Sequence, residues 1–91
     1  MIENKGCTAI TVFIKDGMVF CANAGDSRCV AGIAGKAVPL STDHKPTLSR
    51  EKQRVIKAGF SVNGEGRIDG NLNLSRSIGD LRYKKNKKLK P

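Results

Sequence analysis

The chain has 91 residues, a formal net charge of +9 at pH 7 and an aromatic content of 4%. A chain of this length is one small domain or part of a larger one, and a complete enzyme with its own deep cleft would be unusual. No leader segment opens the sequence, and no apolar run approaches the roughly 18 residues of a membrane span. We therefore expect a cytoplasmic or nuclear protein without a membrane partner.

The positive charge is concentrated at one end of the chain. Residues 81–91 contain six basic and no acidic residues, so residues 1–80 carry a net charge of only +3. No aromatic residue interleaves the lysines as a base-stacking platform would, and we do not expect a nucleic-acid partner. Cys7, Cys21 and Cys29 are odd in number and lack C-x-x-C spacing, which argues against a disulfide framework and against a zinc site.

The first forty residues have the pattern of an antiparallel β-meander. Four short apolar runs are predicted to be strands: 6–14, 18–22, 28–33 and 37–40. The glycine-containing pairs Asp16-Gly17 and Gly35-Lys36 predict the tight turns, because glycine accepts the positive φ that hairpin turns require. The first run is apolar on both faces, so we expect it to be a central strand that is covered on both sides.

The second half of the chain predicts a corner and one helix. Pro46 disfavours helix at Lys45, so residues 41–46 form an irregular corner. A helix is predicted over residues 48–58, with Thr47 or Ser49 as the N-cap and Gly59 as its C-terminal stop. Three apolar side chains share the predicted buried face of this helix: Leu48, Val55 and Ile56. The fold class is therefore α+β.

Beyond the helix the pattern is weaker. Residues 60–62 predict a short extended piece, and residues 63–66 and 69–71 predict turns. Leu72, Leu74 and Ile78 give a mixed apolar pattern that periodicity does not assign.

Residues 22–28 place a glycine, a carboxylate, a hydroxyl and a guanidinium together where one predicted strand leads into the next. Gly25 allows close backbone approach, and Asp26 offers the hard oxygen ligands that Mg²⁺ and Mn²⁺ prefer. An Asp after Gly is also typical of a turn residue that bonds its own backbone. The residues alone leave both interpretations open.

Three further polar residues invite a functional and a structural interpretation. His44, the only histidine, has the chemistry of a general base, but a hydrogen bond at the corner before the helix is the simpler role. Asp43 is interpreted as a turn or capping residue of the same corner. Arg76, between two serines, can grip a phosphate by bidentate bonding or form a surface salt bridge.

Six segments in this order resemble motifs of the metal-dependent serine/threonine protein phosphatases of type 2C. The segments read G-C-T-A (6–9), A-N-A-G-D-S-R (22–28), L-S-T-D-H-K-P (40–46), E-K-Q-R-V-I-K-A-G (51–59), R-I-D-G-N-L (67–72) and L-S-R-S-I-G-D (74–80). Each motif is weak alone, but six in the correct order are specific.

The resemblance implies a β-sandwich flanked by helices, with hydrolysis of phosphoserine and phosphothreonine in phosphoproteins by metal-activated water. Residues 1–80 would be part of the catalytic domain, with strands over 6–40 and a helix and flap-like segment over 41–80, and residues 81–91 a basic tail. The resemblance further implies Mg²⁺ or Mn²⁺ as cofactor, Asp26 as a ligand of an additional metal, and Arg76 as a substrate-binding residue.

The sequence also departs from the family pattern. The family's Asp-Gly-His-Gly-Gly motif is absent, since neither Asp16-Gly17 nor Asp69-Gly70 is followed by His, and no later Asp-Gly or Asp-Asn motif follows Asp80. We therefore assign no catalytic residue and expect this chain alone to be catalytically incomplete. The alternative is a non-catalytic phosphatase-like binding module that uses its flap and basic tail. Exposed sheet edges would also allow self-association.

Overall fold

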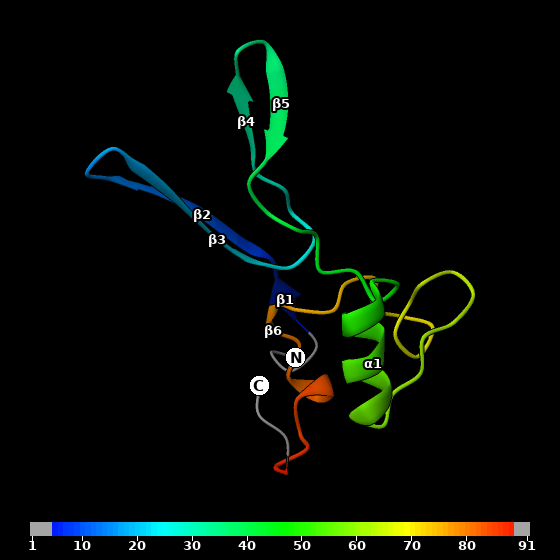
Figure 1. Cartoon of the computed structure of the whole chain (residues 1–91). Helices are drawn as coiled ribbons and strands as arrows, with labels where there is room; N and C mark the ends of the chain where they lie inside the picture. Colours follow the sequence, from blue (N-terminus) through cyan, green and yellow to red (C-terminus); the bar gives the residue numbers. More distant parts are fainter. Residues whose placement is uncertain (1–4, 89–91) are drawn as a thin grey trace.

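The computed structural model of the chain describes residues 5–88. The elements are β1 (Gly6–Cys7), β2 (Ala9–Lys15), β3 (Met18–Ala24), β4 (Val30–Ile33), β5 (Lys36–Pro39), α1 (Ser49–Lys57) and β6 (Ile78–Gly79), followed by a single 3₁₀ turn, Leu81–Tyr83. Figure 1 shows two long hairpins, β2–β3 and β4–β5, that project from a body formed by α1, β1, β6 and their connections. The mixed α and β content is as predicted.

Both predicted hairpins are present. In β2–β3 the register runs from Ala9↔Ala24 to Lys15↔Met18, and Asp16 and Gly17 form the turn with φ of 53° and 74°. Two successive residues with positive φ are typical of a type I′ turn, whose backbone twist matches the right-handed twist of the two flanking strands. The β4–β5 turn lies at Ala34 and Gly35, one residue earlier than predicted, with φ of 50° and 76°.

The predicted four-stranded meander is wrong. The strands form three separate two-stranded sheets, in which β2 pairs with β3, β4 with β5, and β1 with β6. The connection between β3 and β4 does not continue a sheet, because its backbone bonds to a later segment: Leu40 N–H donates to Cys29 O (2.9 Å) and His44 N–H to Gly25 O (2.8 Å). The meander fails at this connection.

The first predicted strand is divided between two sheets. Thr8 separates β1 from β2, and β1 pairs antiparallel with β6 in the register Gly6↔Gly79 and Cys7↔Ile78. The β1–β6 pair places Ile78 in a strand, whereas Leu72 and Leu74 lie outside the named strands. It also brings residues 74–80 next to the junction that follows β3.

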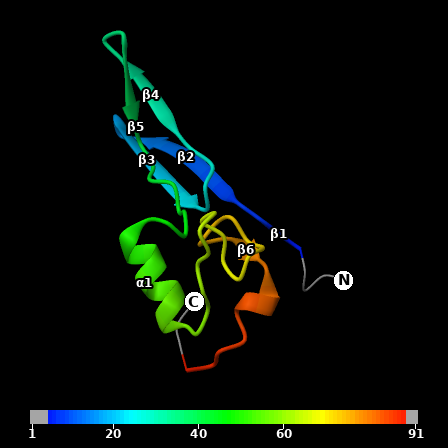
Figure 2. The same ribbon diagram turned by 90° about the vertical axis from the view of Figure 1, so that its right-hand side faces the viewer.

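The expectation that the first strand is covered on both sides is wrong for the described part of the chain. The exposed fractions of Val12, Phe13 and Ile14 are 52%, 60% and 70%. Their strand pairs only with β3, and Figure 2 shows the hairpins extending away from α1. The radius of gyration is 15.2 Å, whereas a compact domain of this length would have about 12 Å. The β-sandwich, the flap and self-association through sheet edges stay predictions.

Helix α1 ends as predicted and begins differently. Leu48 is the N-cap residue and makes no side-chain capping bond, so the predicted capping by Thr47 or Ser49 is wrong. At the other end Phe60 N–H donates to Val55 O (3.2 Å) and Gly59 N–H to Ile56 O (3.0 Å). With Gly59 at φ 95°, this is a Schellman motif, in which glycine adopts the left-handed conformation.

The buried face of α1 carries a charge. Val55 is 5% exposed, but Ile56 is 53% exposed, so the prediction that Ile56 lies on the buried face is wrong. Glu51, one turn before Val55, is 1% exposed. Val55 and Ile68 are the only buried hydrophobic side chains that the described residues contain, apart from Pro46. The interior of this chain is therefore built around a polar group as much as around an apolar one.

The start of the predicted basic tail is ordered. The Phe60 and Tyr83 rings lie with their centroids 5.6 Å apart, and Lys84 Nζ donates to Ser77 O (2.7 Å). Residues 89–91 of the predicted tail lie outside the described residues. Across the described segment no helix is both long and apolar enough to span a membrane.

Candidate functional site

Asp26 lies in the connection after β3 and is paired with a lysine. Lys45 Nζ is 2.7 Å from Asp26 Oδ2, and the same Nζ donates to Asn73 O (3.1 Å). The Asp26 side chain is 21% exposed and that of Lys45 is 42% exposed. The ammonium group thus ties the Asp26 loop to the segment around residue 73.

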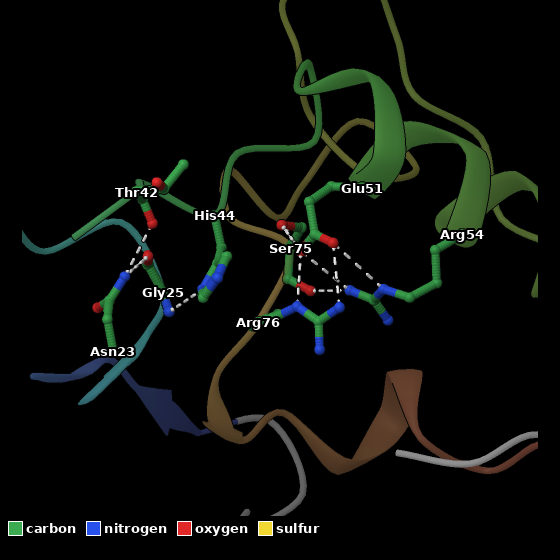
Figure 3. A network of polar contacts seen from close by, with 8 residues as sticks. All are labelled: Asn23, Gly25, Thr42, His44, Glu51, Arg54, Ser75 and Arg76. Atoms are coloured by element: carbon green, nitrogen blue, oxygen red, sulfur yellow. Dashed lines mark hydrogen bonds and ion pairs between the residues drawn. The ribbon is translucent and has the colours of Figure 1, made fainter. Parts of the chain in front are cut away.

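His44 forms two hydrogen bonds with Gly25, the residue before Asp26. Gly25 N–H donates to His44 Nδ1 (3.0 Å), and His44 N–H donates to Gly25 O (2.8 Å). Asn23 Nδ2 adds bonds to Gly25 O (3.1 Å) and Thr42 O (3.0 Å), as Figure 3 shows. The predicted hydrogen bond of His44 at the corner is confirmed. Because Nδ1 accepts a hydrogen bond, the neutral ring carries its proton on Nε2.

Gly25 occupies a position that only glycine fits. Its φ is +120°, and an added Cβ would lie 2.5 Å from Thr8 Cγ2 and 3.2 Å from Arg76 O. The Thr8 and Ser27 hydroxyls share a hydrogen bond of 2.7 Å across the same contact. The Asp26 loop is therefore packed against both neighbouring segments.

Asp43 lies in the corner, where Lys45 N–H donates to Asp43 O (3.1 Å), and its side chain forms an ion pair. Arg28 Nε donates to Asp43 Oδ1 (3.1 Å) and Arg28 Nη2 to Asp43 Oδ2 (2.7 Å). The hydrogen bond from Arg28 lowers the pKa of Asp43 and outweighs the effect of partial burial. This bidentate pair links the segment just before β4 to the corner over residues 41–46.

A second polar cluster surrounds the carboxylate of Glu51. Arg76 donates through Nε to Oε1 (2.8 Å) and through Nη2 to Oε2 (3.1 Å), and Ser75 Oγ donates to Oε1 (2.7 Å). Arg54 approaches with Nη2 3.3 Å from Oε1, and its Nη2 also donates to Ser75 O (2.5 Å). Figure 3 shows both guanidinium groups pointing at this one carboxylate.

Glu51 is ionised despite its burial. Burial alone would raise its pKa, but hydrogen bonds from Arg76, Ser75 and Arg54 outweigh burial and lower the pKa to about 2. Sequence reasoning did not single out this residue. The signal was available, because Glu51 lies four positions before Val55 on the buried helix face, where a carboxylate requires a partner.

The two clusters form one continuous network. Ser75 N–H donates to His44 O (3.0 Å). Ser75 therefore contacts both Glu51 and His44, and His44 in turn bonds to Gly25. Arg76 pairs with a buried carboxylate and not, as the residues alone suggested, with a surface one. Its side chain is still 41% exposed. Its predicted role in substrate binding stays a prediction.

A cavity of about 550 Å³ lies beside the Glu51 cluster. Four basic side chains line it, together with the rings of Phe60 and Tyr83; the basic residues are Arg54, Lys57, Arg76 and Lys84. No acidic side chain of the described residues lines this cavity. Such a lining has the chemistry to hold an anion.

The described residues do not complete a divalent-metal site. Residues 5–88 contain no group of three or more His, Cys, Asp or Glu side chains that could hold one ion. Mg²⁺ and Mn²⁺ need several oxygen ligands, and the carboxylate of Asp26 is already paired with Lys45. One carboxylate of this kind does not make a metal centre.

Comparisons with known proteins agree on one family. The family model described as protein phosphatase 2C matches residues 1–90. Probable protein phosphatase 2C 21 of Arabidopsis thaliana is 55% identical over 85 residues, which are 93% of this chain and 24% of that protein. Protein phosphatase 2C homolog 2 of Hypocrea jecorina is 53% identical over 89 residues, 98% of this chain and 20% of that protein.

A solved structure gives the same result for the fold. The crystal structure of a phosphatase from a pathogenic strain of Toxoplasma gondii superposes with a TM-score of 0.74 and 43% identity, over 80% of this chain and 23% of that one. The chain therefore spans a quarter or less of the length of these relatives.

Proposed function

This chain belongs to the protein phosphatase 2C family, and on that premise we propose that it contributes to the hydrolysis of phosphoserine and phosphothreonine in phosphoproteins. One observation carries the proposal. Segments 22–28, 40–46, 51–59 and 74–80 lie far apart in the sequence, yet they meet in one hydrogen-bonded network. In it Ser75 bonds both His44 O and Glu51, and His44 clasps the residue before Asp26.

The finer part of the proposal concerns the metal. Asp26 would contribute one carboxylate to a Mg²⁺ or Mn²⁺ site whose other ligands lie beyond the described residues. Asp26 is partly exposed and held by a solvent-accessible lysine, so an ion can compete for it. Because the described residues supply no complete ligand set, we propose that this chain alone is catalytically incomplete.

A chimera tests the proposal. The chain replaces the matching quarter of the Arabidopsis relative, and release of phosphate from a phosphothreonine peptide is measured in Mn²⁺, with circular dichroism as the check on folding. We expect activity that Asp26→Asn lowers at least about tenfold, as expected for loss of a metal ligand. Asp16→Asn, in the hairpin turn, is the matched control and should leave the rate unchanged. A folded but inactive chimera would overturn the proposal.

The isolated chain provides the complementary measurement. In excess Mn²⁺ it should release no phosphate from the same peptide. Robust turnover that Asp26→Asn abolishes would contradict the incomplete site.

The alternative, a non-catalytic binding module, predicts binding to an acidic partner that weakens with salt and is lost when residues 82–91 are deleted. No observation favours it over a phosphatase.

Cys7, Cys21 and Cys29 are free thiols, which supports the proposal of a cytoplasmic or nuclear location.

A further inference from the structure

We infer that the cavity beside the Glu51 cluster binds a phosphate monoester carried on a peptide. This phosphate-binding cavity is lined by Arg54 and Lys57 of α1, by residues 75–77, and by Ala24, Ala58, Phe60, Tyr83, Lys84 and Asn86. The choice of a phosphopeptide as ligand rests on the proposed function, whereas the choice of an anion rests on the cavity itself.

The charge of the cavity is strongly positive. Arg54 and Lys57 come from α1, Arg76 from the segment before β6, and Lys84 from the segment after the 3₁₀ turn. Among the described residues, Glu51 is the acidic side chain that forms salt bridges with these cations, through Arg76 and Arg54. Asp80 lines the adjoining smaller cavity together with Arg54, Arg76 and Lys84. The four cations, Glu51 and Asp80 together leave a net charge of +2. A phosphate monoester carries about −1.5 to −2 at neutral pH, so it offsets this charge better than one carboxylate does.

Donors remain available on the cationic side chains. Arg76 and Arg54 each use Nε and Nη2 in the Glu51 cluster, and neither Nη1 bonds to any described residue. Lys57 Nζ likewise makes no hydrogen bond within the described part of the chain. Guanidinium groups that are already fixed in position by one anion lose little entropy when they bind a second one.

The size and the wall of the cavity favour a peptide over a free ion or a nucleic acid. At about 550 Å³ it is far larger than a single phosphate and lies within the range of about 300–1,000 Å³ typical of organic ligands. The Phe60 and Tyr83 rings, 5.6 Å apart, offer apolar surface for neighbouring side chains. A single-stranded nucleic acid would require an extended track with several stacking rings.

The test is titration of the intact chain, without divalent metal, by calorimetry and by ¹H–¹⁵N chemical-shift mapping. The ligands are a phosphoserine peptide, the same peptide unphosphorylated, inorganic phosphate and a short single-stranded RNA. We expect the phosphopeptide to bind most tightly and to shift the amides of residues 54–58 and 75–77. Tighter binding of RNA, or equal binding of free phosphate or of the unphosphorylated peptide, would overturn the inference.

A pair of double variants separates a site from overall charge. Lys57→Gln with Lys84→Gln should weaken phosphopeptide binding about tenfold, as expected for the loss of two partly screened charge contacts. Lys36→Gln with Lys52→Gln removes the same charge at exposed positions outside the cavity and should change the affinity less than about twofold. Equal loss in both pairs would overturn the inference. Since no metal or turnover is involved, an inactive chimera with intact phosphopeptide binding would count against the proposed function alone.

Discussion

Arg76 and Glu51 are joined by two hydrogen bonds, Nε to Oε1 at 2.8 Å and Nη2 to Oε2 at 3.1 Å, across 25 positions of sequence. The acceptor is almost completely buried while the donor is 41% exposed. The pair therefore fastens the segment before β6 to the buried face of α1, and it leaves one side of the guanidinium open. Because few apolar side chains are buried within residues 5–88, this contact should contribute much of the stability.

Replacing Glu51 by Gln should destabilise the chain by about 2–3 kcal/mol, because two guanidinium groups lose their shared anion. Their partial exposure lets water solvate them, so the loss should stay below that of a fully buried pair. Urea unfolding followed by circular dichroism measures the change. Glu65→Gln is the matched control, since Glu65 is exposed, and it should shift stability by less than about 0.5 kcal/mol. Equal effects of the two changes would contradict this role of Glu51.

The same carboxylate predicts acid sensitivity. The pKa of Glu51 falls from 4.5 to about 2 on folding, so its contribution is present above pH 4.5 and is lost as the pH falls toward 2. After allowance for the exposure of its arginine partners, the loss should reach about 1–2 kcal/mol. The check is urea unfolding between about pH 6 and pH 2.5.

Asp43 also has a lowered pKa because of Arg28, so it contributes to acid sensitivity in the same direction. The quantity to measure is therefore the difference between the unsubstituted chain and Glu51→Gln. That difference should shrink as the pH falls through this window. A difference that does not change with pH would show that folding leaves the pKa of Glu51 unshifted, and it would contradict stabilisation of the ionised carboxylate by its hydrogen bonds.

Local patterns predicted the local structure well. The Asp16-Gly17 turn and the Gly59 helix end are fixed by residues within a few positions, since each depends on a backbone conformation that glycine adopts freely. The meander failed because strand pairing across the Gly25 connection is decided by segment 40–44, which competes for the same backbone groups. Periodicity does not contain that competition.

Burial was the harder property to predict. Alternating apolar residues predict a covered strand, yet Ile14 is 70% exposed and β2 pairs with β3 alone among the described strands. Conversely, the sequence prediction assigns Glu51 to a motif and not to the core. The position of Glu51 on the helix face of Val55 indicates burial, but periodicity does not identify its partner, because Arg76 lies just before β6 and is positioned by the β1–β6 pairing.

Substituting Gly25 by Ala should destabilise the chain by about 3 kcal/mol or more, because both strain and overlap are introduced. The backbone is at φ +120°, and the new Cβ would lie 2.5 Å from Thr8 Cγ2. Gly64→Ala is the control, since Gly64 has open space around it and its φ lies outside the left-handed range. It should change stability by less than about 1 kcal/mol. Thermal and urea unfolding of the two variants measure the contrast, and similar losses would contradict the close approach.

The clasp of His44 on Gly25 can be tested with an isosteric acceptor. His44→Ala removes the acceptor of the Gly25 N–H and should cost about 1–2 kcal/mol, with faster hydrogen exchange at the Gly25 amide. In His44→Asn the side-chain oxygen falls near the position of Nδ1, so exchange at Gly25 should be slowed again and about half of the stability recovered. His44→Gln places its oxygen too far along the side chain and should resemble Ala. If all three variants expose the Gly25 amide equally, the ring of His44 acts by filling space and not as the acceptor that holds the Asp26 loop.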